Sequence, residues 1–231
     1  MKLLVCGHLR NFSNNYYIFV EKYFSKLNAE SKHLVTYKNL GWWSAKNSVT
    51  DGDIIDANKI INFNFFDTIN ILQKEIVQNI AKEYIKPVSI VRPYLRTENM
   101  SSQFAMRYLS CKILNSFVDS NETIVLTRPD ILPSPNMVNA IVDMIKDVDN
   151  DKSLVCYVGG TSVEQGDPFF VGTVSNLKHI MSSSAVNNNE YMDAHAFLDG
   201  AIIGTDIKLK RYPELGWVLC NSPNMTTYRE I

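Results

Sequence analysis

Apolar residues along this chain follow two spacings, one typical of buried strands and one typical of helices. Short runs of apolar or β-branched residues, most of them stopped by Gly, Pro or polar residues, predict strands at residues 2–6, 33–37, 88–91, 124–127, 154–158, 169–172, 201–203, 207–209 and 217–219. Apolar residues at intervals of three or four predict helices over residues 14–28, 67–86, 101–117, 135–148, 176–181 and 190–198. Strand, helix and strand within the first 37 residues have the length of a βαβ unit. The pattern predicts an α/β fold with a mixed, mostly parallel central sheet flanked by helices.

Cap signals support two of these helices. Ser134 followed by Pro135 is a capping residue followed by proline at the first helical position. Ser175 is the expected cap of the helix that follows residues 169–172. Residues 38–53 are expected to be a loop that carries Trp42 and Trp43. No linker or internal repeat interrupts the chain, so we expect a single domain.

The stretch from Thr123 to Pro133 contains charged residues at the end of a predicted strand, where a ligand could bind. Its apolar run stops on Arg128, Pro129 and Asp130, because proline cannot donate to a sheet ladder. Proline also favours an extended residue before it, so Arg128 is expected to continue the direction of the strand. The carboxyl ends of strands are where open α/β sheets bind ligands. Asp130 could hold a metal ion there, or Arg128 and Asp130 could form an ion pair that closes a loop.

Composition narrows the possible classes of protein. The chain has 231 residues, of which 45% are hydrophobic, and a formal net charge of -1, so it lacks the global basic field of many nucleic-acid binders. The four cysteines are widely separated and have no metal-ligand spacing, which indicates buried free thiols in a reducing compartment. The apolar run before Gly7 is too short for a signal peptide, and no run is long enough for a membrane span. We therefore expect a cytoplasmic protein.

Common catalytic motifs are missing, since the sequence has no P-loop, GxGxxG, nucleophile elbow or HExxH. The candidates are charged residues next to predicted strands. Asp130 and Asp167 could converge on Mg²⁺ or Mn²⁺, which prefer oxygen ligands and bridge diphosphate oxygens. Arg10 and Arg128 could hold phosphate oxygens. A carboxylate that does not bind the metal ion could act as general base toward an acceptor hydroxyl.

Several short blocks, in this order, resemble a known family. They are LVCGHLRNF, SSQFAMRYLSCKIL, IVLTRPDILP, GDPFFVGTVSNLKHIMSS and a helix led by Glu190. Together they are similar to small glycosyltransferases of bacterial surface-polysaccharide clusters, phages and large viruses, which resemble the WavE lipopolysaccharide-synthesis group. The resemblance implies one GT-A-like (Rossmann-like) domain over residues 1–231. Its nucleotide-binding part would span about residues 1–130 and its acceptor part about residues 131–231. For a viral protein, the compartment would be the host cytoplasm.

The resemblance also implies roles for particular residues. The donor would be a nucleotide sugar, UDP-linked in our expectation, and a divalent metal (Mn or Mg) would assist. Asp130 stands where GT-A enzymes keep a metal-binding DxD motif, but this chain has RPD, with one carboxylate in place of two. Asp167 and Glu190 are the implied catalytic residues. The implied nucleotide-sugar-binding residues are Gly7, His8, Arg10, Gln103, Arg107, Arg128 and Asp130. As an alternative, Gln103 and Arg107 form the solvated edge of their helix.

The acceptor stays open at this stage. It could be a surface glycan or lipopolysaccharide, or hydroxymethylated pyrimidines of phage DNA. A DNA acceptor would require a basic groove, for which the sequence offers two basic intervals, residues 82–112 and residues 208–211. The alternatives to a transferase are a non-catalytic nucleotide-sugar-binding relative and a metal-dependent nucleic-acid-binding protein. Inverting and retaining chemistry would use the same residue types.

Overall fold

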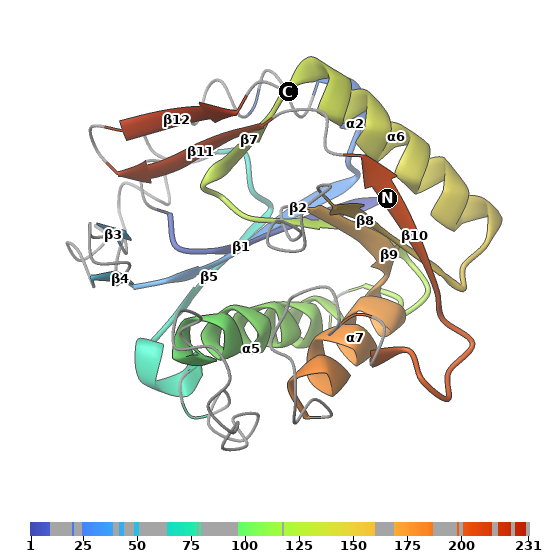
Figure 1. Cartoon of the computed structure of the whole chain (residues 1–231), viewed down its shortest axis with the longest axis horizontal. Coiled ribbons are helices and arrows are strands. Elements are labelled where there is room, and N and C mark those ends of the chain that lie inside the picture. The colour runs from blue at the N-terminus through green and yellow to red at the C-terminus, as the bar shows by residue number, and fades with distance from the viewer. Residues whose placement is uncertain are drawn as a thin grey trace.

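The architecture is that of a computed structural model of the whole chain. It describes residues 1–9, 20, 25–38, 42–43, 49–50, 64–77, 79, 97–116, 118–159, 169–186, 198, 201–213, 217–222 and 225–229. Within these ranges the fold is α/β, as the sequence predicts, with helices on both faces of one large mixed sheet (Figure 1). No helix in the described part of the chain is long and apolar enough to cross a membrane.

The large sheet has seven strands in the order β10-β8-β9-β6-β1-β2-β5. These strands are β1 (Lys2–Gly7), β2 (Ser31–Tyr37), β5 (Thr68–Leu72), β6 (Thr123–Thr127), β8 (Leu154–Gly159), β9 (Phe169–Thr173) and β10 (Lys208–Pro213). β9 runs antiparallel to both of its neighbours, and every other pair in this sheet is parallel. Most strands therefore end at the same edge of the sheet.

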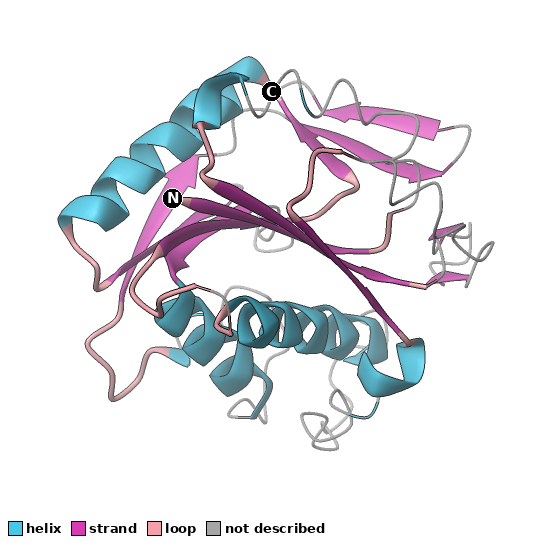
Figure 2. Ribbon diagram, turned by 180° about the vertical axis from the view of Figure 1, so that it is seen from behind, coloured by secondary structure: helices cyan, strands magenta, loops and turns pink. Residues whose placement is uncertain are grey.

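Two hydrophobic cores lie on the two faces of this sheet. Alternate residues of β1 face opposite sides, because side chains in a strand have a period of two. Leu3 and Val5 belong to the core that also contains residues of α6 (Pro135–Asn150). Leu4 and Cys6 belong to the core that also contains residues of α5 (Thr97–Leu114) and α7 (Val174–Val186). The view from behind shows the same layers, with α6 on one side of the sheet and α5 and α7 on the other (Figure 2).

Side-chain caps explain where two of the helices begin. The Ser134 hydroxyl accepts a hydrogen bond from the Met137 amide at 3.1 Å, and Pro135 opens α6, as predicted. α7 begins one residue before the predicted cap Ser175. Its cap is Thr173, whose hydroxyl accepts from the Asn176 amide at 3.1 Å. Both residue types are good caps, and the end of β9 at Thr173 decides between them.

A smaller sheet begins immediately after the Arg128-Pro129-Asp130 turn. It contains β7 (Ile131–Pro133), β11 (Trp217–Ser222) and β12 (Met225–Arg229), all paired antiparallel. β6 ends at Thr127, and the Ile131 amide donates to the Arg128 carbonyl at 3.4 Å, so Arg128 opens a turn. This turn connects the large sheet to the small one.

Several predicted elements are different in the structure. Residues 68–72 form strand β5 and not the start of a helix, because they pair in parallel with His33–Tyr37. Residues 201–203 do not form the predicted strand, since Ala201 is helical and a turn follows. Within the predicted loop at residues 38–53, β3 (Trp42–Trp43) and β4 (Val49–Thr50) pair as short antiparallel strands. The predicted strand at residues 88–91 and most of the predicted helices at 14–28 and 190–198 lie outside the described residues; the short helix α2 (Ser25–Leu27) belongs to the first of them.

Candidate functional site at the carboxyl edge of the sheet

The candidate site lies where β1, β2 and β6 end side by side. β1 pairs with β2 on one side and with β6 on the other, so the strand order changes direction between β1 and β6. Such a switch point leaves a crevice at the carboxyl ends of the strands, where open α/β sheets bind ligands. The segment after β1 and the turn after β6 are therefore the segments that would meet a ligand.

Gly7 brings these two segments together. Its φ of +132° lies in a region that residues with a side chain rarely adopt. A Cβ built on Gly7 would lie 3.5 Å from Cδ of Pro129, which is ordinary contact, so the backbone conformation and not space requires glycine here. The Thr36 hydroxyl donates a 2.8 Å hydrogen bond to the Gly7 carbonyl and ties it to β2. The ends of three strands are thus joined through Gly7.

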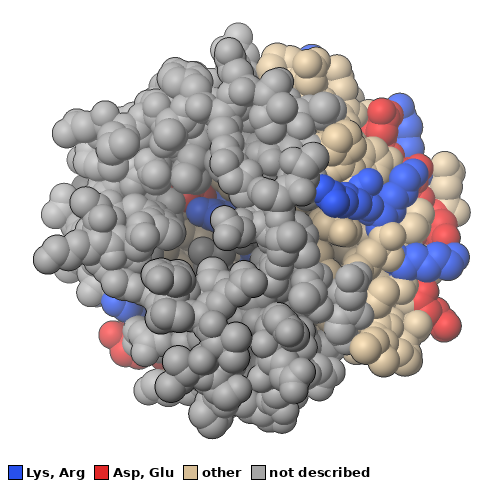
Figure 3. Space-filling model, viewed as in Figure 1, with Lys and Arg blue, Asp and Glu red and all other residues tan. Residues whose placement is uncertain are grey.

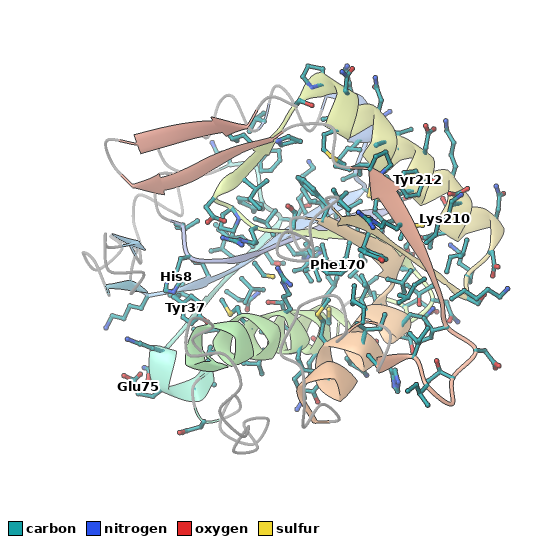
Figure 4. The ribbon with its side chains drawn as sticks, in the orientation of Figure 1. His8, Tyr37, Glu75, Phe170, Lys210 and Tyr212 are labelled. Atoms are coloured by element: carbon teal, nitrogen blue, oxygen red, sulfur yellow. The ribbon has the colours of Figure 1, made fainter. Side chains whose placement is uncertain are left out.

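An aromatic stack lies next to this junction. The imidazole ring of His8 stacks on the ring of Tyr37, with 4.1 Å between centroids and 19° between planes (Figure 4). Tyr37 is buried, and this burial is the main reason why the pKa of its hydroxyl is raised. The Tyr37 hydroxyl therefore stays neutral, and the ring holds His8 at the end of β1. Of the predicted binding residues, Gly7 and His8 lie at the edge where a ligand is expected.

Arg128 and Asp130 form a two-point ion pair within the turn after β6. Nε of Arg128 donates to Oδ1 of Asp130 at 2.9 Å, and Nη2 donates to Oδ2 at 2.7 Å. The side chain of Asp130 is 3% exposed and that of Arg128 is 17% exposed, so the pair is shielded from water. This parallel geometry is the strongest form of arginine–carboxylate contact. The loop-closing ion pair that the sequence allows is therefore present.

This arrangement does not fit the expected metal site at Asp130. Both carboxylate oxygens accept hydrogen bonds from a guanidinium, so a cation bound to Asp130 would be placed next to a fixed positive charge. The residues that the structure describes contain no group of three or more His, Cys, Asp or Glu side chains that could hold a metal ion. In this conformation Asp130 is the partner of an arginine and is not presented to a metal.

Arg107 and Gln103 lie on α5, on one face of the large sheet. Arg107 is 3% exposed, and its guanidinium carbon lies 5.3 Å from the centroid of the Phe170 ring in β9. A solvated helix edge is therefore the wrong description of Arg107, because the residue is in the core. The backbone of Gln103 belongs to α5, and its side chain is outside the described residues.

Three predicted site residues, Arg10, Asp167 and Glu190, lie outside the described residues. The structure does describe the strand that follows Asp167 in the chain. Phe169, the first residue of β9, pairs with Thr127, the last residue of β6. Because the two strands are antiparallel, β9 begins at the edge where Arg128 follows β6.

The basic residues at 208–211 are largely engaged by carboxylates. Lys208 donates to Asp151 at 3.0 Å, and Lys210 donates to Asp147. Asp147 also accepts from the hydroxyl of Tyr212. Basic and acidic side chains consequently alternate on the part of the surface formed by β10 and α6 (Figure 3). This is a mixed surface and not the uniformly basic groove that a DNA acceptor would require.

The sequence interpretation missed two contributors to the site, Thr36 and Tyr37. Both lie at the carboxyl end of a predicted strand that follows β1 in a βαβ unit. Parallel strands joined in this way end at the same edge of a sheet. Thr36 and Tyr37 could therefore have been placed next to Gly7 and His8 from the sequence.

Comparisons with known proteins place the chain in no family. No protein-family model matches it, and no curated protein matches it significantly.

Proposed function

We propose that this protein is a glycosyltransferase that moves a sugar from a nucleotide-sugar donor to an acceptor hydroxyl. The observation that carries the proposal is the junction of three strand ends at the switch point of the sheet. Gly7 contributes backbone with no side chain, Arg128 contributes a cation, and His8 contributes a ring held by Tyr37. A diphosphate needs cations and close backbone approach, and a base or sugar ring can stack on an aromatic surface.

The fold supports this proposal by analogy. The resemblance noted in the sequence calls for an open α/β sheet with mostly parallel strands, and the observed sheet has this architecture. In such a sheet a ligand is expected at the carboxyl ends of the strands. One fold hosts many functions, so this analogy adds to the argument from the site and does not replace it.

The chemistry that we propose is a displacement at the anomeric carbon of the donor sugar. A bond forms between that carbon and the acceptor oxygen, and the bond to the diphosphate oxygen breaks. The nucleoside diphosphate leaves with the bonding electrons, and Arg128 stabilises the negative charge that develops on it. The acceptor proton goes to a general base. Asp167, two residues before β9 in the chain, is our candidate for this base, and Glu190 is the second candidate.

We propose a glycan and not DNA as the acceptor. The carboxylates of Asp147 and Asp151 engage Lys210 and Lys208 and reduce the positive charge of that basic interval. In the other interval, Arg107 is buried in the core. A phosphate backbone requires exposed cations in a continuous row. Those basic residues of the two intervals that the structure describes do not supply one, and residues 82–96 lie outside the described part of the chain.

A ligand screen tests the proposal. The melting temperature of the protein is measured with UDP-, GDP-, CMP- and TDP-linked sugars, because a ligand that binds only the native state raises it by mass action. We expect one nucleotide class to raise it, and we expect that donor to be consumed when a pool of oligosaccharide acceptors is added. If a donor binds but no sugar is transferred to any acceptor, the protein is a nucleotide-sugar-binding relative without activity. Binding of DNA with no response to any nucleotide sugar would overturn the proposal.

A further inference from the structure

We propose that Thr36 is a positioning residue for the nucleotide-sugar donor, and that it acts by fixing the peptide between Gly7 and His8. This inference rests on the proposed function and assigns a further role within that same site. Thr36 is fully buried in β2, so it acts through Gly7 and not by contact with the donor. It holds the segment that leaves β1 in the conformation that binds the donor.

The hydroxyl of Thr36 is the first argument. It donates a 2.8 Å hydrogen bond to the Gly7 carbonyl. The Tyr37 carbonyl lies 3.5 Å from the same oxygen, which is too long for a second strong hydrogen bond. A buried hydroxyl costs free energy unless it is bonded, and valine would fill the same space without that cost. The hydroxyl at position 36 therefore serves the contact with Gly7.

The backbone of Gly7 is the second argument. Glycine has no side chain to restrict its backbone and loses more conformational freedom on folding than any other residue. The φ of +132° at Gly7 is one of many values that a glycine adopts readily. A peptide unit is planar, so a hydrogen bond that fixes the Gly7 carbonyl also fixes the orientation of the His8 amide. The Thr36 hydroxyl therefore sets the direction in which the chain leaves β1.

The position of this contact is the third argument. Gly7 and Thr36 pair in the last register row of β1 and β2. On the other side of β1, Cδ of Pro129 lies 3.5 Å from the point where a Cβ of Gly7 would lie. The next residues along the two strands, His8 and Tyr37, stack on each other. The peptide that Thr36 fixes thus lies at the switch point of the sheet, where a donor is expected to bind.

The experiment measures the dissociation constants of UDP, GDP and inorganic pyrophosphate by titration calorimetry, each with and without Mn²⁺. For the anion that binds the unmodified protein, Thr36→Val should weaken binding about tenfold, because it removes one hydrogen bond from the site and keeps the shape of the side chain. Thr36→Ser keeps the hydroxyl and should bind within about twofold of the unmodified protein. Equal affinity of Thr36→Val and Thr36→Ser would overturn the inference.

Thr123→Val is the matched control for the loss of a buried hydroxyl. Thr123 is 3% exposed, and its hydroxyl donates to Asp149 at 2.7 Å. It is the first residue of β6, so it lies at the end of that strand opposite to the candidate site. Thr123→Val should lower the melting temperature, as Thr36→Val does, but should leave the affinity within about twofold. If both variants weaken binding equally, the loss reflects stability alone and the inference is overturned.

The double variant Gly7→Ala/Thr36→Val tests whether Thr36 acts through Gly7. If it does, Thr36→Val will cause no further loss of affinity in the Gly7→Ala background. Independent, additive losses would overturn the inference. If Thr36→Val does not fold, Thr36→Cys takes its place, because a thiol is a weaker donor than a hydroxyl. Thr36→Cys should weaken binding about threefold, and affinity equal to that of Thr36→Ser would again overturn the inference.

The outcomes distinguish this inference from the proposed function. If a nucleotide binds and Thr36→Val binds it as tightly as the unmodified protein does, the inference is overturned while the transferase proposal stands. If none of the three anions binds and no nucleotide sugar raises the melting temperature, the proposed function fails and the inference fails with it.

Discussion

Two ion-paired regions of this molecule use the same side-chain chemistry in different surroundings. At the end of β6, Arg128 and Asp130 are paired in a turn where the carboxylate is 3% exposed. Along β10 and α6, Lys208 pairs with Asp151 and Lys210 pairs with Asp147, with side chains between 29% and 65% exposed. In Figure 4, His8 and Tyr37 mark the side of the molecule where the strand-end site lies, and Lys210 and Tyr212 mark the opposite side.

The difference shows that the burial of an ion pair, and not its presence alone, indicates a candidate functional site. Exposed pairs contribute little, because water screens the charges and long side chains lose freedom. A shielded pair is strongly coupled, so each partner depends on the other. β10 is the edge strand of the sheet, and charged residues on an edge strand oppose pairing with another chain. We interpret the β10–α6 region as a solvated edge whose charges oppose pairing with another chain. We interpret the strand-end region as the candidate functional site.

The largest expected effect comes from removing one partner of the shielded pair. Asp130→Ala leaves the Arg128 charge without its carboxylate, so we expect the free energy of unfolding to fall by about 3 kcal/mol. Urea denaturation measures it. Asp143→Ala, in the exposed pair with Lys146, should change it by no more than about 0.5 kcal/mol. Equal losses in the two variants would contradict the contrast between the regions.

A smaller effect is expected from a side chain at Gly7. Gly7→Ala forces alanine into a φ of +132°, which should cost about 1–3 kcal/mol of stability and also weaken nucleotide binding. Gly204→Ala is the matched control, because Gly204 also has a positive φ, of +75°, but a Cβ there would meet nothing within 4 Å. It should cost about 1 kcal/mol and leave binding unchanged. Equal loss of binding in both variants would mean that Gly7 matters only for stability.

Acid should weaken the β10–α6 region in a defined pH window. Hydrogen bonds from Ser153 and then Lys208 lower the pKa of Asp151 to about 2, from a usual value of 3.8. A depressed pKa contributes stability that is present above the unfolded value and is lost as pH falls through the folded one. The urea midpoint should therefore fall between about pH 4 and pH 2. Asp151→Asn should make the decline shallower, and an unchanged pH profile in this variant would contradict the assignment.

The smallest effect is expected from the exposed lysines. Lys208→Gln and Lys210→Gln should shift the urea midpoint only slightly, because the two lysine side chains are 65% and 48% exposed and water screens their ion pairs. Neither variant should change nucleotide affinity. Loss of DNA binding in fluorescence anisotropy, measured with these variants, would instead assign a nucleic-acid role to β10.

The chemistry of the cysteines agrees with a reduced, structural role in the described part of the chain. Cys6, Cys111 and Cys156 are buried thiols that are not part of a disulfide. Burial raises the pKa of Cys111 and, to about 12, that of Cys156, so neither thiol is a thiolate near neutral pH. The sequence indicated buried free thiols, and for these three residues that prediction is confirmed.

The sequence predicted those parts of the fold that depend on local signals. The buried strands at residues 2–6, 124–127 and 154–158 were recognised because both faces of each are apolar. α6 was recognised from its cap and its apolar period. By contrast, Ile69, Leu72 and Ile76 have spacings that fit a helix, yet residues 68–72 form an edge strand. Hydrogen bonds to β2 decide this, and a local pattern carries no information about a partner strand that lies 35 residues earlier in the chain.

The candidate site divides in the same way. From the sequence alone, Arg128 and Asp130 were placed at the end of a strand, and Gly7 and His8 at the end of another, because turn-forming residues stop both runs. Only the tertiary structure decided that these two ends are neighbours, that Tyr37 stacks on His8, and that Asp130 holds an arginine rather than a free coordination position. The physical reason is that strand order and side-chain pairing depend on contacts between distant segments, whereas strand ends depend on the few residues that form them.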